Sequence, residues 1–136
     1  MNVEVKLTIT ESVDDAGNLV VDDGGNIMYT QHDGMVLQRI LSIYDFSKID
    51  KSGIRDIVGL IDEVSHVTKS SGSVINLTPG QYSQLKSVVV SPKDYLKQET
   101  RTGGGSVTFD MVVNNLFVQR SLISLEDQFN EIDKRK

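Results

Sequence analysis

The chain has 136 residues, of which 38% are apolar and 24% are charged. This length suits one compact domain, and this composition excludes a disordered tail and a fibrous protein. Cysteine is absent, which excludes a disulfide framework and thiolate chemistry. Apolar runs fall far short of the roughly 20 residues of a membrane-spanning helix, and Met1–Thr10 does not resemble a signal peptide. We therefore expect a globular cytoplasmic protein that does not bind a membrane.

The acidic residues are concentrated near the N-terminus. Residues 1–35 contain seven Asp and Glu residues but only one base, Lys6, whereas the rest of the chain is nearly balanced. The formal net charge of the whole chain is −5. Because duplex nucleic acid is bound through basic surfaces that displace counterions, nucleic acid is not an expected partner.

The N-terminal segment shows the two-residue period of β-strands and two similar turn signals. Apolar and polar residues alternate from Val3 to Thr10, which predicts a half-buried strand. Asp14–Asn18 and Asp22–Asn26 are related clusters of residues that favour turns. Together these features predict a small antiparallel β-meander of two or three strands that ends near Thr30.

After the meander, the apolar residues recur at helical spacing. A first helix of about ten residues is predicted to start near Asp33, with Thr30 or Asp33 as its N-cap. A second helix is predicted to follow a cap at Ser52, because the apolar residues from Ile54 to Val64 share one helical face.

Two further helices and a link are predicted in the next part of the chain. Thr78–Gln81 has threonine, proline and glutamine in the positions of a capping box, which predicts a helix from Pro79 to about Val89. Ser91-Pro92 repeats the cap-then-proline pattern and predicts a short fourth helix. Residues 101–106 contain three consecutive glycines and are predicted to be a flexible link.

Residues 107–136 are predicted to form a helical segment outside a core domain of residues 1–100. The start of this segment fits either a strand through Met111 or a helix capped by Thr108, and we favour the helix. Further on, a second apolar stripe is out of phase with the first. It consists of Leu122, Leu125, Phe129 and Ile132. Because a short domain buries few apolar faces, we expect this stripe to be exposed and to bind a partner.

No group of residues predicts catalysis, a cofactor or a metal. The acidic turn clusters lack the twelve-residue spacing and distal glutamate of a calcium loop, so hairpin turns are the preferred interpretation. The glycines after Arg101 lack the Gly-Lys-Ser/Thr sequence of a Walker loop. Neither His32 nor His66 has neighbours in the sequence that would complete a catalytic triad. We therefore expect a protein that is not an enzyme.

Three arginines provide an alternative hypothesis. Arg39, Arg55 and Arg101 would form a phosphate site if the fold brought them together. Solvated helix faces explain such residues more simply. The alternative function is that of a protein that sequesters a small nucleotide ligand and so counters host defence signalling.

Two segments share a pattern with a known group of proteins. In Thr30–Leu37, threonine and aspartate precede an apolar helix, and Leu77–Lys86 reads Leu-Thr-x-x-x-Tyr-x-x-Leu-Lys. The order of features from Gly17 to Val90, about half of the chain, resembles that of small uncharacterised proteins of tailed bacteriophages. The resemblance implies a phage or prophage origin, in the host cytoplasm or the virion, and supplies no catalytic residues.

The sequence therefore predicts an α+β fold in which a small antiparallel sheet packs against four or five helices. The predicted function is that of a non-enzymatic accessory or structural phage protein that acts through protein–protein contacts. Self-association through the C-terminal stripe is the expected form of contact.

Overall fold

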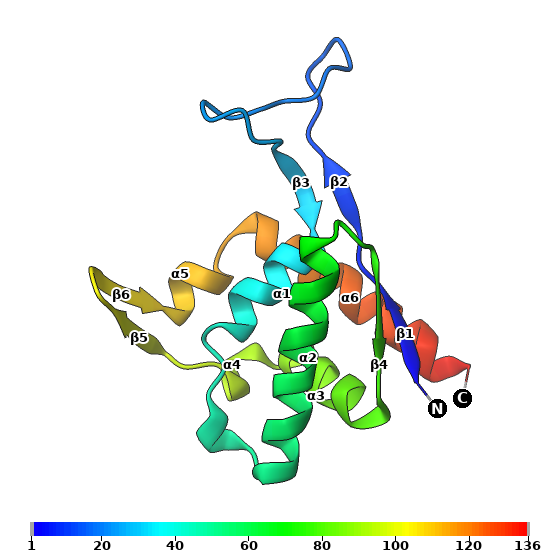
Figure 1. The fold of residues 1–136 in the computed structure, drawn as a ribbon, viewed down its shortest axis with the longest axis vertical. Helices are drawn as coiled ribbons and strands as arrows, with labels where there is room; N and C mark the ends of the chain where they lie inside the picture. The colour runs from blue at the N-terminus through cyan, green and yellow to red at the C-terminus, as the bar shows by residue number, and fades with distance from the viewer. Residues whose placement is uncertain (1, 136) are drawn as a thin grey trace.

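A computed structural model describes residues 2–135 and confirms the α+β class (Figure 1). A helical body carries small antiparallel sheets, and a long arm projects from one end of it. The elements in chain order are β1 (Val3–Lys6), β2 (Ile9–Glu11), β3 (Tyr29–His32), α1 (Asp33–Leu41), the 3₁₀ helix η1 (Phe46–Lys48), α2 (Lys51–Lys69), β4 (Val74–Leu77), α3 (Pro79–Val90), α4 (Pro92–Tyr95), β5 (Glu99–Thr102), β6 (Gly105–Thr108), α5 (Phe109–Val113) and α6 (Leu116–Lys134).

The predicted first strand is divided between two sheets. β1 pairs antiparallel with β4, so that Val5 lies opposite Ile75 and both side chains are fully buried. β2 pairs instead with β3, in the ribbon that leads into the arm. The division falls at Thr8, whose N–H donates to the carboxylate of Asp33 at 2.8 Å and not to a neighbouring strand. The meander is therefore not continuous, because β1 finds its partner far along the chain.

Three helix starts follow the expected capping chemistry, with shifts of up to two residues, whereas Ser91 before α4 makes no side-chain capping bond and Pro92 alone marks that start. The predicted capping box of α3 is confirmed: the Gln81 N–H donates to the Thr78 hydroxyl at 3.2 Å, and the Thr78 N–H donates to the Gln81 side chain at 3.0 Å. The cap of α2 is Asp50 and not Ser52. The cap of α1 is His32, because Thr30 belongs to β3 and the carboxylate of Asp33 is turned toward Thr8.

The predicted division of the chain near residues 101–106 is wrong. These residues form the end of the β5–β6 hairpin, in which Arg101 lies opposite Ser106. The start of the C-terminal segment is a strand and then a helix: β6 ends at Thr108, whose hydroxyl caps α5 by accepting from Met111 N–H at 3.1 Å. Strand and helix, which were predicted as alternatives for this start, therefore follow each other in the chain.

Helix α6 belongs to the same core as the rest of the chain. It packs against α1, α3 and β3. The side-chain amide of Gln128 also covers the outer edge of β1, accepting from the Lys6 N–H at 2.7 Å and donating to the Lys6 carbonyl at 2.8 Å. These two bonds use the backbone groups that an added strand would otherwise occupy. The described chain thus has one core, to which both of its ends contribute.

The expectation that the C-terminal stripe is exposed is also wrong. Leu122, Leu125 and Phe129 are buried in the core, and Ile132 is partly buried against it. The reason is a break before α6, where the side chain of Asn115 caps a new helix by accepting from Val118 N–H at 2.9 Å. The new helix runs in its own direction, so a stripe that is out of phase with α5 is the core-facing side of α6. No helix within residues 2–135 is long and apolar enough to cross a membrane.

Candidate functional site

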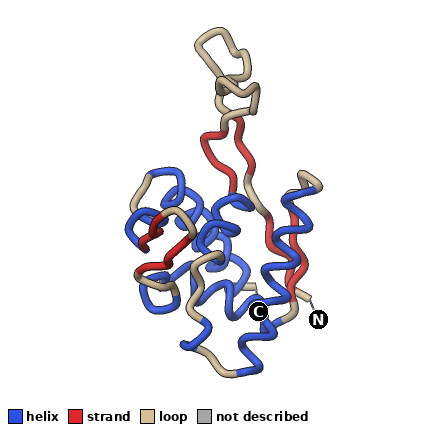
Figure 2. Tube along the Cα trace, turned by 60° about the vertical axis from the view of Figure 1, so that its left-hand side comes forward, coloured by secondary structure: helices blue, strands red, loops and turns tan. Residues whose placement is uncertain are grey.

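The connection between β2 and β3, residues 12–28, forms an arm that extends well beyond the helical body (Figures 1 and 2). The arm contains a tandem repeat of eight residues. Val13–Val20 reads VDDAGNLV, and Val21–Met28 reads VDDGGNIM. Each copy of the repeat makes one tight turn.

The two turns have the same hydrogen bonds. In the first turn, the Asp14 carboxylate accepts the N–H groups of Ala16 and Asn18, at 2.9 Å each. In the second turn, the carboxylate of Asp22 accepts the equivalent two N–H groups at the same distances. The glycine of each Asp-Asp-x-Gly-Asn cluster has a positive φ, +85° or +82°, which favours glycine. The predicted turns are confirmed.

Backbone hydrogen bonds hold the two turns together. The N–H of Val20 donates to the carbonyl of Ser12, that of Met28 donates to the carbonyl of Val20, and that of Ser12 donates to the carbonyl of Met28. These three bonds are 2.9–3.0 Å long and close a ring at the point where the turns meet. The conformation of the arm therefore rests on its backbone and on the carboxylates of Asp14 and Asp22, and none of these bonds uses an apolar side chain.

The apolar side chains of the arm are exposed to solvent, with exposed fractions of 36–59%. They are Val13, Leu19, Val20, Val21, Ile27 and Met28. Val13 lies opposite Leu19 across the first turn, and Val21 lies opposite Ile27 across the second. The arm also contains four aspartates and no base. Its surface thus combines exposed apolar side chains with acidic turns, which makes the arm the candidate site.

The base of the arm is tied to the body by hydrogen bonds, of which those to Asp33 are partly buried and that from Arg120 is exposed. Asp33, at the start of α1, is fully buried, and one of its carboxylate oxygens accepts the Thr8 N–H at 2.8 Å while the other accepts the Gln31 side chain at 3.0 Å. Arg120, in α6, donates to the carbonyl of Thr30 at 3.0 Å. The stalk formed by β2 and β3 is thereby fixed to both α1 and α6.

His32 has a structural role at this base. Its Nδ1 accepts the N–H of Met35 at 3.2 Å and so caps α1, and its ring lies edge-on to Tyr29, with 4.9 Å between ring centroids. Burial lowers the pKa of the His32 imidazole below its ordinary value, although the nearby carboxylate of Asp33 opposes this shift. The neutral ring is the form that accepts the capping bond.

Acidification is therefore expected to destabilise the fold through His32. A histidine with a lowered pKa in the folded state contributes stability that is present above the unfolded pKa near 6.5 and is lost as the pH falls below it. We expect the melting temperature to fall between about pH 7 and pH 5, and His32→Asn, which retains a capping side chain, to reduce this fall. Thermal unfolding of both proteins across this pH range tests the expectation, which an unchanged pH dependence in the variant would contradict.

An apolar groove, which we call the base groove, lies between the arm and the body. Its volume is about 460 Å³. The arm contributes Ile27, Met28 and Tyr29, α1 contributes Met35, α6 contributes Phe117, and Asp22 and Asn26 of the second turn complete the lining.

Two exposed arginines lie one helical turn beyond residues that line the base groove, although neither lines it. Arg39 follows Met35 by one turn on α1, and Arg120 follows Phe117 by one turn on α6. Each guanidinium is thus carried by a helix face that also lines the groove. The lining of the groove is mostly apolar, its one charged residue is Asp22, and the two helices that contribute to it carry these arginines.

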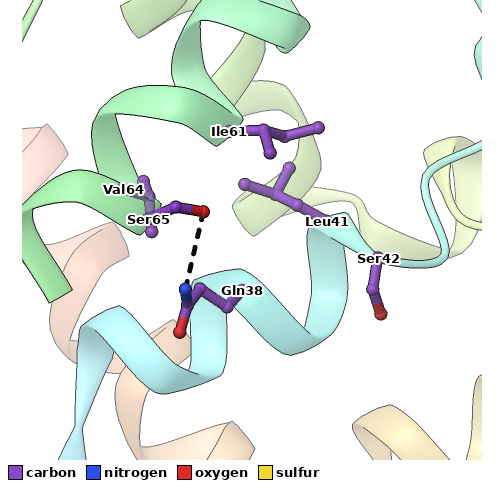
Figure 3. Close-up of a pocket in the computed structure, with 6 residues that line it drawn as sticks. All are labelled: Gln38, Leu41, Ser42, Ile61, Val64 and Ser65. Carbon is purple, nitrogen blue, oxygen red and sulfur yellow. Dashed lines mark hydrogen bonds between the residues drawn. The ribbon is translucent and has the colours of Figure 1, made fainter. Parts of the chain in front are cut away.

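A second hollow, of about 270 Å³, lies between α1 and α2 (Figure 3). The side chain of Gln38 donates to the hydroxyl of Ser65 across it at 3.5 Å. The other lining residues are Leu41, Ser42, Ile61 and Val64. The polar side chains of the lining are Gln38, Ser42 and Ser65, and none of its residues is charged.

The arginines of the nucleotide hypothesis lie on three different elements. Arg39 is exposed on α1, Arg55 on α2 and Arg101 on β5. Arg101 lines a shallow hollow of the β5–β6 hairpin, together with Glu99, and neither of the other two arginines lines it. No group of three or more His, Cys, Asp or Glu side chains within residues 2–135 is placed to hold a metal ion.

Comparison of the chain with protein-family models, with curated proteins and with solved structures finds no match. The geometry of the arm and the base groove therefore supplies the argument for function. The turns of the arm were predicted from the sequence, whereas the exposure of its apolar residues was not. The eight-residue repeat was the available signal, because it places valine, leucine or isoleucine beside each acidic turn.

Proposed function

We propose that the protein is a non-enzymatic accessory or structural protein that associates with itself through the arm. The observation that supports this proposal is the exposure of six apolar side chains on a segment that projects away from the core. Burial of such side chains at an interface is favourable by roughly 25 cal/mol for each Å² of apolar surface. In this proposal the interface is the arm and not the C-terminal stripe.

The order of the arm supports the same proposal. Its turns and their junction are closed by hydrogen bonds of the arm itself, and its stalk is fixed by Asp33 and Arg120. A preorganised segment loses little conformational entropy when it binds, so more of the burial energy is retained as affinity. An arm without a partner would expose apolar surface with no benefit to the fold.

Sedimentation velocity over about 1–100 µM tests this function, since the range covers micromolar dissociation constants. We expect the intact chain to form dimers or larger oligomers, and the variant V13S/L19S to remain monomeric. The control V58S/V90S removes two apolar side chains from α2 and α3 that are exposed by 47% and 45%, similar to the 48% of Leu19, and should associate like the intact chain. An intact chain that is monomeric over the whole range would refute self-association.

A further inference from the structure

We infer that the arm of one copy occupies the base groove of a second copy, and that the second copy returns the same contact. This inference rests on the proposed self-association and specifies which surfaces meet. Each copy carries both an apolar projection and an apolar groove. A two-fold pair satisfies both surfaces at once, because every contact in such a dimer is made twice.

Both surfaces expose apolar side chains. Residues that lie directly opposite each other in an antiparallel pair project to the same side, so Val13 and Leu19 form one apolar knob on the first turn. The base groove offers a receiving surface that includes Met35 and Phe117. Met35 is 45% exposed in the single chain and is available for such a contact.

The charges favour an antiparallel arrangement of the two arms. Side-by-side parallel arms would bring the aspartates of both turns together, eight carboxylates in all when the four of each arm are counted. Antiparallel arms instead place the acidic turns of one copy next to the helices of the other, where Arg39 and Arg120 lie. The attraction between these opposite charges selects the second arrangement.

Individual aspartates divide into two roles within this contact. Asp14 and Asp22 accept the N–H groups that close their own turns. The carboxylate of Asp22, which lines the groove, also accepts from the side chain of Asn26 at 3.4 Å, so hydrogen bonds within its own turn stabilise its charge. The turn-closing bonds do not use Asp15 and Asp23, which are exposed and provide the charges for a partner.

A charge-reversal experiment tests this pairing. The arm variant D15K/D23K and the groove variant R39E/R120E should each weaken self-association by at least about tenfold, because both contacts of each homodimer become repulsive. In an equimolar mixture, the lysine-bearing arm meets the glutamate-bearing groove, and the unchanged arm meets the unchanged groove. We therefore expect the mixture to recover association, measured by sedimentation velocity with one variant labelled.

The controls separate loss of folding from loss of pairing. Arg120 also donates to Thr30, so the variant R39E keeps this bond and should show the same effect more weakly. Circular dichroism and thermal unfolding of each variant establish that it is folded. If the intact chain dimerises but the mixture does not recover association, the arm does not occupy the groove, although self-association stands. If the intact chain is monomeric, both proposals fail. The arm would then bind a different protein with an apolar and basic surface.

Discussion

Replacing Phe129 with alanine is expected to lower the free energy of unfolding by about 3–5 kcal/mol. The side chain of Phe129 is fully buried on α6 and meets the ring of Tyr82 edge-on, with 5.5 Å between centroids. The substitution removes this contact and leaves a cavity between α3 and α6. A domain of this size has a total stability of roughly 5–15 kcal/mol, so the loss is a large part of the whole.

Urea unfolding followed by circular dichroism measures this effect. The matched control is Ile123→Ala on the same helix, whose side chain is 59% exposed and whose removal should change stability by less than about 0.5 kcal/mol. A similarly small loss for Phe129→Ala would indicate that α6 is not part of the core and would restore the original hypothesis of a separate C-terminal interface.

Replacing Asp33 with alanine is expected to lower the free energy of unfolding by about 2–3 kcal/mol. Its carboxylate is buried and accepts from both Thr8 N–H and the side chain of Gln31, so alanine leaves these donors without their acceptor. The affected bonds join the β1–β2 connection to the start of α1. The substitution should therefore also loosen the stalk of the arm and weaken self-association.

The variant Asp33→Asn provides a graded comparison, because its amide oxygen can still accept one hydrogen bond. Its free energy of unfolding, measured with urea, should lie between those of the intact chain and Asp33→Ala. Asp62→Ala removes an exposed carboxylate from α2 and serves as the control. Equal stability of Asp33→Ala and this control would refute the role of Asp33 as the anchor of the stalk.

Signals within short stretches of the sequence predicted several elements of the fold. The capping box at Thr78 and the Asp-Asp-x-Gly-Asn turns were recognised because their hydrogen bonds join residues only two to four positions apart. The cap of α1 was misplaced since His32 was considered only as a catalytic or metal-binding residue. A histidine with a neutral ring accepts hydrogen bonds, and its position before α1 was the available signal.

The candidate site was less accessible to sequence analysis. Exposure of the arm depends on whether other segments cover it, and the pattern of Val13, Leu19 and Val21 is equally compatible with a buried meander. The base groove combines residues from the arm, α1 and α6, and the most distant of them, Asp22 and Phe117, are 95 positions apart in the chain. Neither the groove nor its neighbouring arginines form a recognisable pattern along the sequence.

The sequence by itself determined the α+β class, the starts of α3 and α4, and the two acidic turns, because these depend on periodicity and on hydrogen bonds between near neighbours. Tertiary structure decided that β1 pairs with β4, that the stripe of α6 is buried, and that the apolar side chains of the arm are not. The physical reason is that burial is a property of distant residues brought together. The local sequence pattern around an apolar side chain is the same whether the rest of the chain covers it or leaves it exposed.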